Sequence, residues 1–248
     1  VEKMNVLVTG GAKGIGQAIS LEFAAHGVNV AINYSKSEKQ AEETIAKLEK
    51  LGVKAIAIKA DVSKEDQVKK MVERAWTELG PLEFLVNNSG IYAETPGKPF
   101  YELTSEEWDT VMNVNTKGTW LVSKYVAAKM IEGKVKGSIV NISSIAGLDA
   151  ARAGAHYGAS KAAVISLTKS FCNEMGKHGI RVNSIAPGAV MTEMMARVPP
   201  EKNEHMRLET PLQKLSTTED IAKAVYALAN LSNVSGQTLI VDGGRLKH

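Results

Sequence analysis

Three side chains that could exchange a proton with a substrate lie in one stretch, residues 144–161. Ser144 carries a hydroxyl, Tyr157 a phenol and Lys161 an ammonium group. Tyr157 and Lys161 are four residues apart, so on a helix they share one face, one turn apart. A phenol has a pKa of about 10, and an adjacent ammonium favours the phenolate and lowers that pKa. The pattern indicates acid–base chemistry, which is useful only if a group nearby exchanges a hydride.

The spacing Tyr-x-x-x-Lys is not specific by itself, because it occurs again at residues 125–129. Tyr157 follows an expected strand that ends near Ser144, so the hydroxyl and the phenol can converge at one sheet edge. Tyr125 lies in mid-helix, about 15 Å along the axis from Asn115. We therefore interpret Tyr125 as a packing or interface residue.

A glycine-rich turn, residues 9–16, follows the first expected strand and opens a helix. Gly10, Gly14 and Gly16 have the spacing G-x-x-x-G-x-G rather than G-x-G-x-x-G. Glycines allow the backbone to turn tightly and approach a ligand. A helix N-terminus offers free N–H groups and a partial positive charge to a diphosphate. The turn predicts a dinucleotide site, which would supply the hydride carrier.

The residues after the second strand bear on which dinucleotide binds. That segment reads Asn33, Tyr34, Ser35 and Lys36. NAD sites of this type usually carry an acid here, bonded to the ribose 2′-hydroxyl, whereas this chain has none before Glu38. An acid would repel a 2′-phosphate, and Lys13 or Lys36 could pair with one. We therefore expect NADP(H), with NAD(H) as the less favoured cofactor.

Asp61, after the third strand, fits two roles. It is placed to accept a hydrogen bond from the adenine amino group, or it simply caps the helix that begins near Ser63. The residue types leave both roles open.

Short apolar runs alternate with amphipathic segments along the chain. The expected strands are residues 5–9, 28–33, 55–59, 84–87, 138–142, 181–186 and 238–241. The expected helices are residues 14–26, 37–51, 104–131, 157–177 and 217–231, with one more around residues 68–75. This alternation predicts a single α/β domain, residues 1–248, built on a doubly wound, Rossmann-like parallel sheet of about seven strands with helices on both faces. Ligands of such sheets bind at the carboxyl ends of the strands.

Composition limits the classes of function. The chain has 248 residues, of which 44% are hydrophobic and 23% charged. Its net charge of +3 is too small to argue for nucleic acid or a membrane as partner. The single cysteine, Cys172, permits no internal disulfide and favours a reducing compartment. No apolar run approaches the about 18 residues of a membrane span, and residues 1–9 are too short and strand-like for a signal peptide. We expect a cytoplasmic protein without a metal site.

Together these motifs resemble the short-chain dehydrogenase/reductase family in its simple, single-domain form. The resemblance covers essentially the whole chain. It rests on residues 9–16, 61–62, 87–90, 113–115, 236–237 and 242–244, with Ser144, Tyr157, Lys161, Pro187, Gly188 and Thr192. One departure is Ser89, where the family usually has alanine.

The resemblance implies a role for each residue. Tyr157 would be the acid in carbonyl reduction and the base in alcohol oxidation, and Lys161 would lower its pKa and bond the nicotinamide ribose. Ser144, rather than Ser143, would polarise the substrate oxygen. Asn115 would hold a proton-relay water, with a helix-kinking or packing amide as the alternative. The expected catalytic residues are thus Asn115, Ser144, Tyr157 and Lys161. The expected cofactor-binding residues are Gly10, Lys13, Gly14, Ile15, Gly16, Asn33, Tyr34, Ser35, Asp61, Val62, Asn88, Ser89, Gly90, Tyr157, Lys161, Pro187, Gly188, Val190 and Thr192.

The substrate stays open at this stage. The polar, Met-rich segment 191–212 is expected to be irregular and to fold over the substrate as a lid. Met191, Met194, Met195 and Met206 would form an adaptable apolar wall, or some of them pack onto the domain. The motifs are most similar to those of 3-oxoacyl-[acyl-carrier-protein] reductases. A glucose, other sugar or small secondary-alcohol dehydrogenase shares them.

Partners follow from the same resemblance. The substrate would be a small carbonyl or alcohol compound, with an acyl carrier protein as a candidate partner. Lys134, Lys136 and Lys177 could dock such an acidic protein, although we favour the interpretation of a plain solvated surface. The family is commonly tetrameric, which implies a homotetramer through the helices 104–131 and 157–177 and the last strand. A catalytically silent NADP-sensing protein would be expected to lack one of the three reactive residues.

Overall fold

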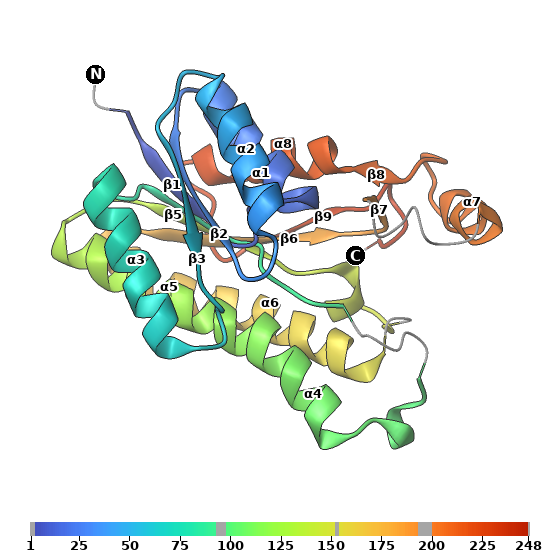
Figure 1. The fold of residues 1–248 in the computed structure, drawn as a ribbon. Helices are drawn as coiled ribbons and strands as arrows, with labels where there is room; N and C mark the ends of the chain where they lie inside the picture. The colour runs from blue at the N-terminus through green and yellow to red at the C-terminus, as the bar shows by residue number, and fades with distance from the viewer. Residues whose placement is uncertain (1–2, 93–97, 152–153, 193–199, 248) are drawn as a thin grey trace.

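The computed structural model describes residues 3–92, 98–151, 154–192 and 200–247. Its centre is a seven-stranded parallel sheet with the order β3-β2-β1-β4-β5-β6-β9 (Figure 1). The strands are β1 (Asn5–Val8), β2 (Asn29–Tyr34), β3 (Ala55–Lys59), β4 (Phe84–Asn87), β5 (Ser138–Ile142), β6 (Arg181–Pro187) and β9 (Thr238–Val241). The predicted α/β sheet and all seven of its strands are confirmed.

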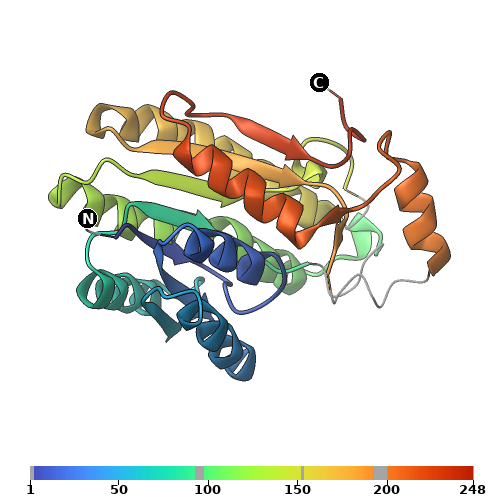
Figure 2. The same ribbon diagram turned by 90° about the horizontal axis from the view of Figure 1, so that it is seen from above.

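Helices cover both faces of the sheet. The α-helices are α1 (Gly14–Ala25), α2 (Glu38–Glu49), α3 (Glu65–Leu79), α4 (Ser105–Met112), α5 (Gly118–Glu132), α6 (Ala155–Met175), α7 (Pro200–Leu208) and α8 (Thr218–Asn230). α1, α2 and α8 lie on one face, and α3, α5 and α6 on the other (Figure 1). Seen from above, α1 and α8 lie side by side across the strands (Figure 2).

Two hydrophobic cores follow from this layering. The first joins the sheet to α1, α2 and α8, and Phe23 packs in it against Phe84 at 5.2 Å between ring centres. The second joins the sheet to α3 and α5, with Met71, Leu121 and Met130 fully buried. Central strands such as β1 and β4 are buried throughout because both of their faces are covered.

The strand order reverses between β1 and β4. From β1 the chain builds outward through β2 and β3, and from β4 it builds in the other direction. The two strands pair with Val6 opposite Phe84, so residues 9–16 and 88–90 leave the sheet side by side. Such a switch point is where open α/β sheets bind ligands.

The predicted helix 104–131 contains a π-helical turn. Thr104 caps its start and forms a capping box with Glu107. α4 then passes into a π-helical turn, Asn113–Lys117, before α5. A π-turn inserts one extra residue and frequently marks a functional site.

The segment 191–212 is more regular than predicted. It contains α7 (Pro200–Leu208), and Val190–Met191 form a short strand, β7, that pairs with β8 (Ser216–Thr217). Met194 and Met195 lie outside the described residues. Met191 is 48% exposed and Met206 is partly buried.

Within the described residues, no helix is long and apolar enough to cross a membrane.

Candidate active site

The glycine turn forms a cradle that fits a dinucleotide. A Cβ on Gly16 would lie 2.1 Å from the Gly10 carbonyl oxygen, so only glycine allows α1 to approach β1 this closely. Gly14 has a φ of +55° and open space where a side chain would be. No side chain caps the first turn of α1, which leaves its N–H groups for a ligand. The residues present therefore fit a diphosphate at this helix N-terminus.

The turn after β4 is tied to the glycine turn. The Thr9 hydroxyl accepts hydrogen bonds from the backbone N–H groups of Asn88 and Ser89, both at 3.0 Å. The Asn88 amide donates to the carbonyls of Thr9 and Gly10, at 3.0 and 3.2 Å. The predicted cofactor residues of both turns are thus brought together.

Asn33 supports the cradle from beneath. Its side chain is 1% exposed and donates to the carbonyl of Ala60 at 2.9 Å. Its Oδ1 accepts from the Gly10 N–H at 3.3 Å and the Ser89 hydroxyl at 3.4 Å. The Asn33 side chain therefore supports the glycine turn, and its contact with the cofactor stays a prediction.

The exposed residues beyond Asn33 line the edge of the cradle. Ser35 is exposed, and the Tyr34 hydroxyl donates to Glu38 at 3.4 Å. The Glu38 carboxylate also lies 3.6 Å from the Lys59 ammonium. Glu38, the first acidic residue of this segment, is therefore paired with both Lys59 and the Tyr34 hydroxyl. Lys13 is exposed at the cap position of α1.

Asp61 closes a local turn before α3 but does not cap that helix, whose N-cap residue is Lys64 and has no side-chain cap hydrogen bond. Its Oδ1 accepts from the Ser63 N–H at 2.9 Å and the Ser63 hydroxyl at 2.7 Å, just before α3. The neighbouring Val62 is 5% exposed and packs against Gly118 of α5. The side chain of Val62 therefore does not line the cradle, and cofactor contacts at both positions stay predictions.

Ser144 follows β5 and is the serine that faces the site. It caps a short 3₁₀ turn, its hydroxyl accepting from the Ala146 N–H at 3.1 Å, and it forms a hydrogen bond with Tyr157. Ser143 is buried and donates to the Ile185 carbonyl at 2.8 Å. The choice of Ser144 over Ser143 agrees with this arrangement.

The pKa of Tyr157 moves against the sequence-based expectation. Burial raises it to about 12, and the hydrogen bond from Ser144 opposes that rise without cancelling it. The Lys161 ammonium does not counter this burial: it lies 5.8 Å from the centre of the phenol ring. Tyr157 is therefore protonated at neutral pH, as a proton donor must be.

Lys161 is held by the strand that precedes the serine. Its ammonium donates to the Ile142 carbonyl at 2.9 Å, and the residue is 5% exposed. Burial lowers the pKa of Lys161 to about 8. It thus remains mostly charged at neutral pH, with further N–H donors for a ligand.

Asn115 lies in the π-turn and is 1% exposed. Its amide is engaged with the backbone of Ile91 and the hydroxyl of Ser160. The alternative of a packing amide thus describes its side chain, and the water-relay role stays a prediction.

The predicted residues after β6 form the turn from that strand into β7. Pro187 is buried at the end of β6, and Val190 is 7% exposed in β7. The Gly188 N–H donates to the Val241 carbonyl at 3.0 Å, which ties this loop to β9. Thr192 is partly buried.

Sequence reasoning missed Tyr92 and Ser160. The Tyr92 ring lies 5.1 Å from the Tyr157 ring at an angle of 54°, and Tyr92 is 39% exposed. An aromatic residue directly after the 87–90 motif was the signal that could have drawn attention to it. Ser160, three residues after Tyr157, gives no signal because serine is common on helices.

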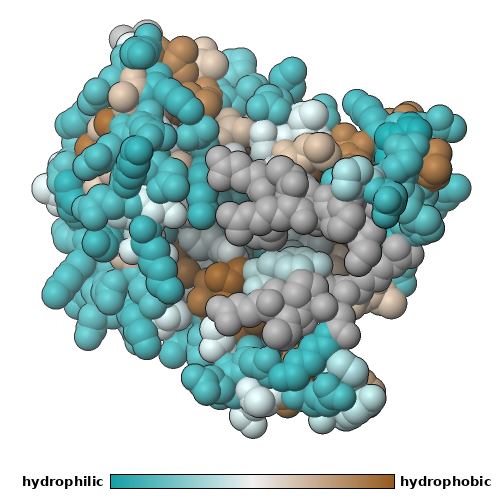
Figure 3. Space-filling model, turned by 45° about the vertical axis from the view of Figure 1, so that its right-hand side comes forward, coloured by the Kyte–Doolittle hydropathy of each residue, from teal (hydrophilic) through white to brown (hydrophobic). Residues whose placement is uncertain are grey.

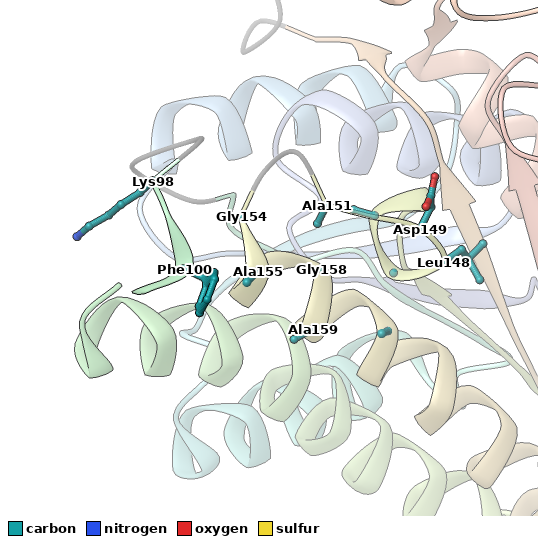
Figure 4. Close-up of a pocket in the computed structure, with 12 residues that line it drawn as sticks. Lys98, Phe100, Leu148, Asp149, Ala151, Gly154, Ala155, Gly158 and Ala159 are labelled. Atoms are coloured by element: carbon teal, nitrogen blue, oxygen red, sulfur yellow. The ribbon is translucent and has the colours of Figure 1, made fainter. Parts of the chain in front are cut away.

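A pocket of about 630 Å³ lies on another side of α6. Ala155, Gly158 and Ala159 line it, with Phe100 across from them (Figure 4). These helix positions lie roughly opposite Tyr157 on the helix. A hollow in which hydrophobic side chains show lies on the face seen in Figure 3.

The second Tyr-x-x-x-Lys copy has no part in this site. The Tyr125 hydroxyl bonds Glu65 at 2.8 Å, and its ring packs on the core beneath α5.

Comparison with known proteins agrees with this geometry. A family model described as enoyl-(acyl carrier protein) reductase matches residues 10–245. The chain is 37% identical over 242 residues to the 3-oxoacyl-[acyl-carrier-protein] reductase of Staphylococcus aureus, covering 97% of each chain. The chain belongs to the short-chain dehydrogenase/reductase family.

Members of other specificity and a solved structure are similarly close. The L-rhamnose 1-dehydrogenase (NAD(P)(+)) of a Sphingomonas species is 37% identical over 248 residues, covering 98% of this chain and 96% of that one. The crystal structure of a 3-oxoacyl-[acyl-carrier protein] reductase from Brucella melitensis superposes with a TM-score of 0.92 at 35% identity, covering 99% and 93%. As a short-chain dehydrogenase/reductase, the chain is an oxidoreductase that acts on CH–OH groups with a nicotinamide dinucleotide.

Proposed function

We propose that this protein is an NADP(H)-dependent 3-oxoacyl thioester reductase, which interconverts a ketone and a secondary alcohol and resembles the 3-oxoacyl-[acyl-carrier-protein] reductases. The observation that carries the proposal is the hydrogen-bonded pair of Ser144 and Tyr157 beside Lys161, at the switch point, in a chain 37% identical to such a reductase. When bound, the cofactor supplies the hydride.

The chain's own residues would divide the remaining work. The Ser144 hydroxyl donates a hydrogen bond to the substrate oxygen and stabilises the charge that develops there. The protonated Tyr157 phenol transfers its proton to that oxygen. A phenol with a pKa of about 12 still protonates an alkoxide, which is a far stronger base. Lys161, charged and held by Ile142, binds the nicotinamide ribose.

Several features support NADP(H) over NAD(H). Lys13 is exposed at the N-terminus of α1, where a 2′-phosphate could reach it. Glu38 is paired with Lys59, which weakens its repulsion of a phosphate. We expect a ratio of kcat/KM for NADPH over NADH above about 10, and a fall in that ratio for Lys13→Ala, since one charge-assisted contact contributes about 1.5–3 kcal/mol.

A substrate panel tests the proposal. Acetoacetyl thioesters, glucose and L-rhamnose are each followed at about 340 nm, where the reduced cofactor absorbs, with NADP(H) and with NAD(H). Turnover of the acetoacetyl thioester above that of both sugars is the expected result. No turnover of the thioester would sink the proposal.

A sugar dehydrogenase is the second candidate. L-Rhamnose 1-dehydrogenase is as similar to this chain as the thioester reductase, at 37% identity. Oxidation of a sugar as the main activity in the panel would favour it. A silent NADP-sensing protein would bind cofactor and turn over no ketone, alcohol or sugar.

The partner and assembly proposals have different support. Lys134, Lys136 and Lys177 are exposed, but they precede β5 or follow α6, about 30 Å along α6 from Tyr157. They give an acyl carrier protein no path to the site of the same protomer, so we propose carrier-bound substrates on similarity alone. We also propose a cytoplasmic homotetramer, with residues 191–212 as the substrate lid.

A further inference from the structure

Ser160 occupies a buried position between the two reactive residues of α6. It is 0% exposed, and its hydroxyl donates to the Tyr157 carbonyl at 2.7 Å. The same oxygen accepts a hydrogen bond from the Asn115 amide at 3.0 Å. The hydroxyl therefore uses both its donor and its acceptor capacity inside the protein.

The Asn115 side chain also bonds the backbone of Ile91, in the segment that follows β4. Its Oδ1 accepts from the Ile91 N–H at 2.8 Å, and its Nδ2 donates to the Ile91 carbonyl at 3.1 Å. With the bond to Ser160, both N–H groups of the amide are satisfied. The side chain thus has one orientation in which every bond is made.

The bonds between Asn115 and Ile91 lie beside two parts of the active site. A Cβ on Gly90 would lie 3.3 Å from both Asn115 Oδ1 and the Lys161 ammonium, so the three residues meet at one point. Ile91 directly precedes Tyr92, whose ring lies 5.1 Å from that of Tyr157. The position of Ile91 therefore determines how its two neighbours in the chain lie against Lys161 and Tyr157.

A second hydrogen bond joins the π-turn to Ser160. The Thr116 hydroxyl donates to the Ser160 carbonyl at 3.3 Å. Because the turn contains an extra residue, Asn115 can bond the Ser160 hydroxyl while Thr116 bonds the Ser160 carbonyl.

We propose that Ser160 is a positioning residue that locks Asn115 against Ile91 and so aligns residues 90–92 with Tyr157 and Lys161. It touches no reacting atom. The inference rests on the reaction class of the family and requires no particular substrate. It predicts that the Ser160 hydroxyl is needed for alignment rather than for cofactor affinity.

The test compares two buried serines that each accept from an asparagine amide. Ser160→Ala removes the lock, and Ser123→Ala is the matched control. The Ser123 hydroxyl is 3% exposed and accepts from Asn87 at 2.9 Å in the core. We expect kcat of Ser160→Ala to fall about 10- to 100-fold, because small misplacements of reacting groups are costly. KM and the dissociation constant for NADPH stay within about two-fold, as does kcat of Ser123→Ala.

Amide hydrogen exchange gives a readout that needs no substrate. The Ile91 N–H is expected to exchange at least about ten-fold faster in Ser160→Ala, and to stay protected in Ser123→Ala. A protected Ile91 amide in Ser160→Ala overturns the proposal, whatever the substrate panel finds. Unchanged kcat in that variant, on any ketone or alcohol that the wild type turns over, also overturns it.

A double-mutant cycle separates the lock from general packing. If Ser160 acts through Asn115, adding Ser160→Ala to Asn115→Ala lowers kcat by less than about two-fold further. Full additivity of the two losses contradicts the proposal. Should Ser160→Ala fail to fold, Ser160→Cys, with its weaker hydrogen bonding, takes its place with the same expected and contradicting results.

Discussion

Tyr157 and Lys161 lie one turn apart on α6, yet the ammonium reaches back to the Ile142 carbonyl and lies 5.8 Å from the centre of the phenol ring. Burial raises the pKa of Tyr157 to about 12 and lowers that of Lys161 to about 8. Both shifts follow from desolvation, which disfavours the charged form of each group. A protonated donor and a charged lysine thus coexist at neutral pH.

The buried lysine makes a prediction about stability and pH. Its pKa is about 8 in the folded state, below the ordinary lysine value of 10.5. Between these values the unfolded chain binds more protons, so the free energy of unfolding rises with pH by up to about 1.4 kcal/mol per unit. Tyr157 acts in the opposite sense only above pH 10, because its pKa rises from 10.0 to about 12.

Urea unfolding of the wild type and of Lys161→Met, at pH values from 7.5 to 9.5, tests this dependence of stability on pH. The wild type is expected to gain stability relative to the variant as pH rises over this about two-unit range. A difference between the two proteins that does not change with pH would contradict the buried, shifted ammonium.

At the scale of elements, the glycine turn determines how closely the N-terminus of α1 approaches β1. Gly16→Ala places a methyl group 2.1 Å from the Gly10 carbonyl oxygen. The turn must open, so we expect NADPH affinity to fall at least about 100-fold, which is about 2.7 kcal/mol. Titration of the cofactor against intrinsic fluorescence measures this.

Gly176→Ala is the control for that substitution. Gly176 has helical backbone angles and no neighbour within 4 Å of an added Cβ. The variant is expected to bind the cofactor normally and to be about 0.5 kcal/mol more stable. Equal affinities for the two variants would show that the cradle is not where the diphosphate binds.

Arg181 secures the end of α8 against the sheet. Its guanidinium donates to the carbonyls of Leu228, Ala229 and Leu231, the last at 2.8 Å. Because these carbonyls lie at a helix C-terminus, Arg181→Ala is expected to lower the free energy of unfolding by about 2–3 kcal/mol. The exposed pair of Arg74 with Glu78 provides the control, since Arg74→Ala should cost at most about 1 kcal/mol. Chemical denaturation distinguishes them, and equal losses would contradict the capping role.

The period of the apolar residues was enough to predict the seven strands. It could not predict the π-turn, because one extra residue leaves the apolar pattern of residues 104–131 intact. It also could not predict α7, whose polar sequence has no apolar face. The π-turn depends on contacts with α6, which the local pattern of apolar residues does not reveal.

At the scale of the whole molecule, α4 and the 3₁₀ turn before it expose aromatic residues. Phe100, Tyr101 and Trp108 are 73%, 74% and 40% exposed, beside a second pocket of about 530 Å³. Such a patch marks an interaction surface in soluble proteins. It lies on the helices through which the proposed tetramer would assemble.

Charge on this patch should therefore dissociate the assembly. Phe100→Asp combined with Trp108→Glu is expected to give a smaller particle than wild type by light scattering during gel filtration. Leu51→Glu, at a 46% exposed position away from these helices, should leave the mass unchanged. A wild-type monomer, or a double variant of wild-type mass, contradicts this assembly.

Which residues of the site could be read from the sequence depended on whether chemistry or packing selects them. Ser144, Tyr157 and Lys161 were found because their residue types carry the reaction. The burial of Asn33 and the hydrogen bonds of Asp61 with Ser63 could not be found, because only the neighbouring strands and turns reveal where an amide or a carboxylate points. The same applies to the direction of the Tyr157 pKa shift.

Tyr157→Phe tests the central claim most directly. The variant keeps the ring and its packing against Tyr92 but removes the proton that reaches the substrate oxygen. Reduction of an acetoacetyl thioester by NADPH is expected to fall about 10²- to 10⁴-fold in kcat, while the dissociation constant for NADPH stays within about two-fold. A variant that retains near wild-type kcat would contradict Tyr157 as the proton donor and, with it, this account of the site.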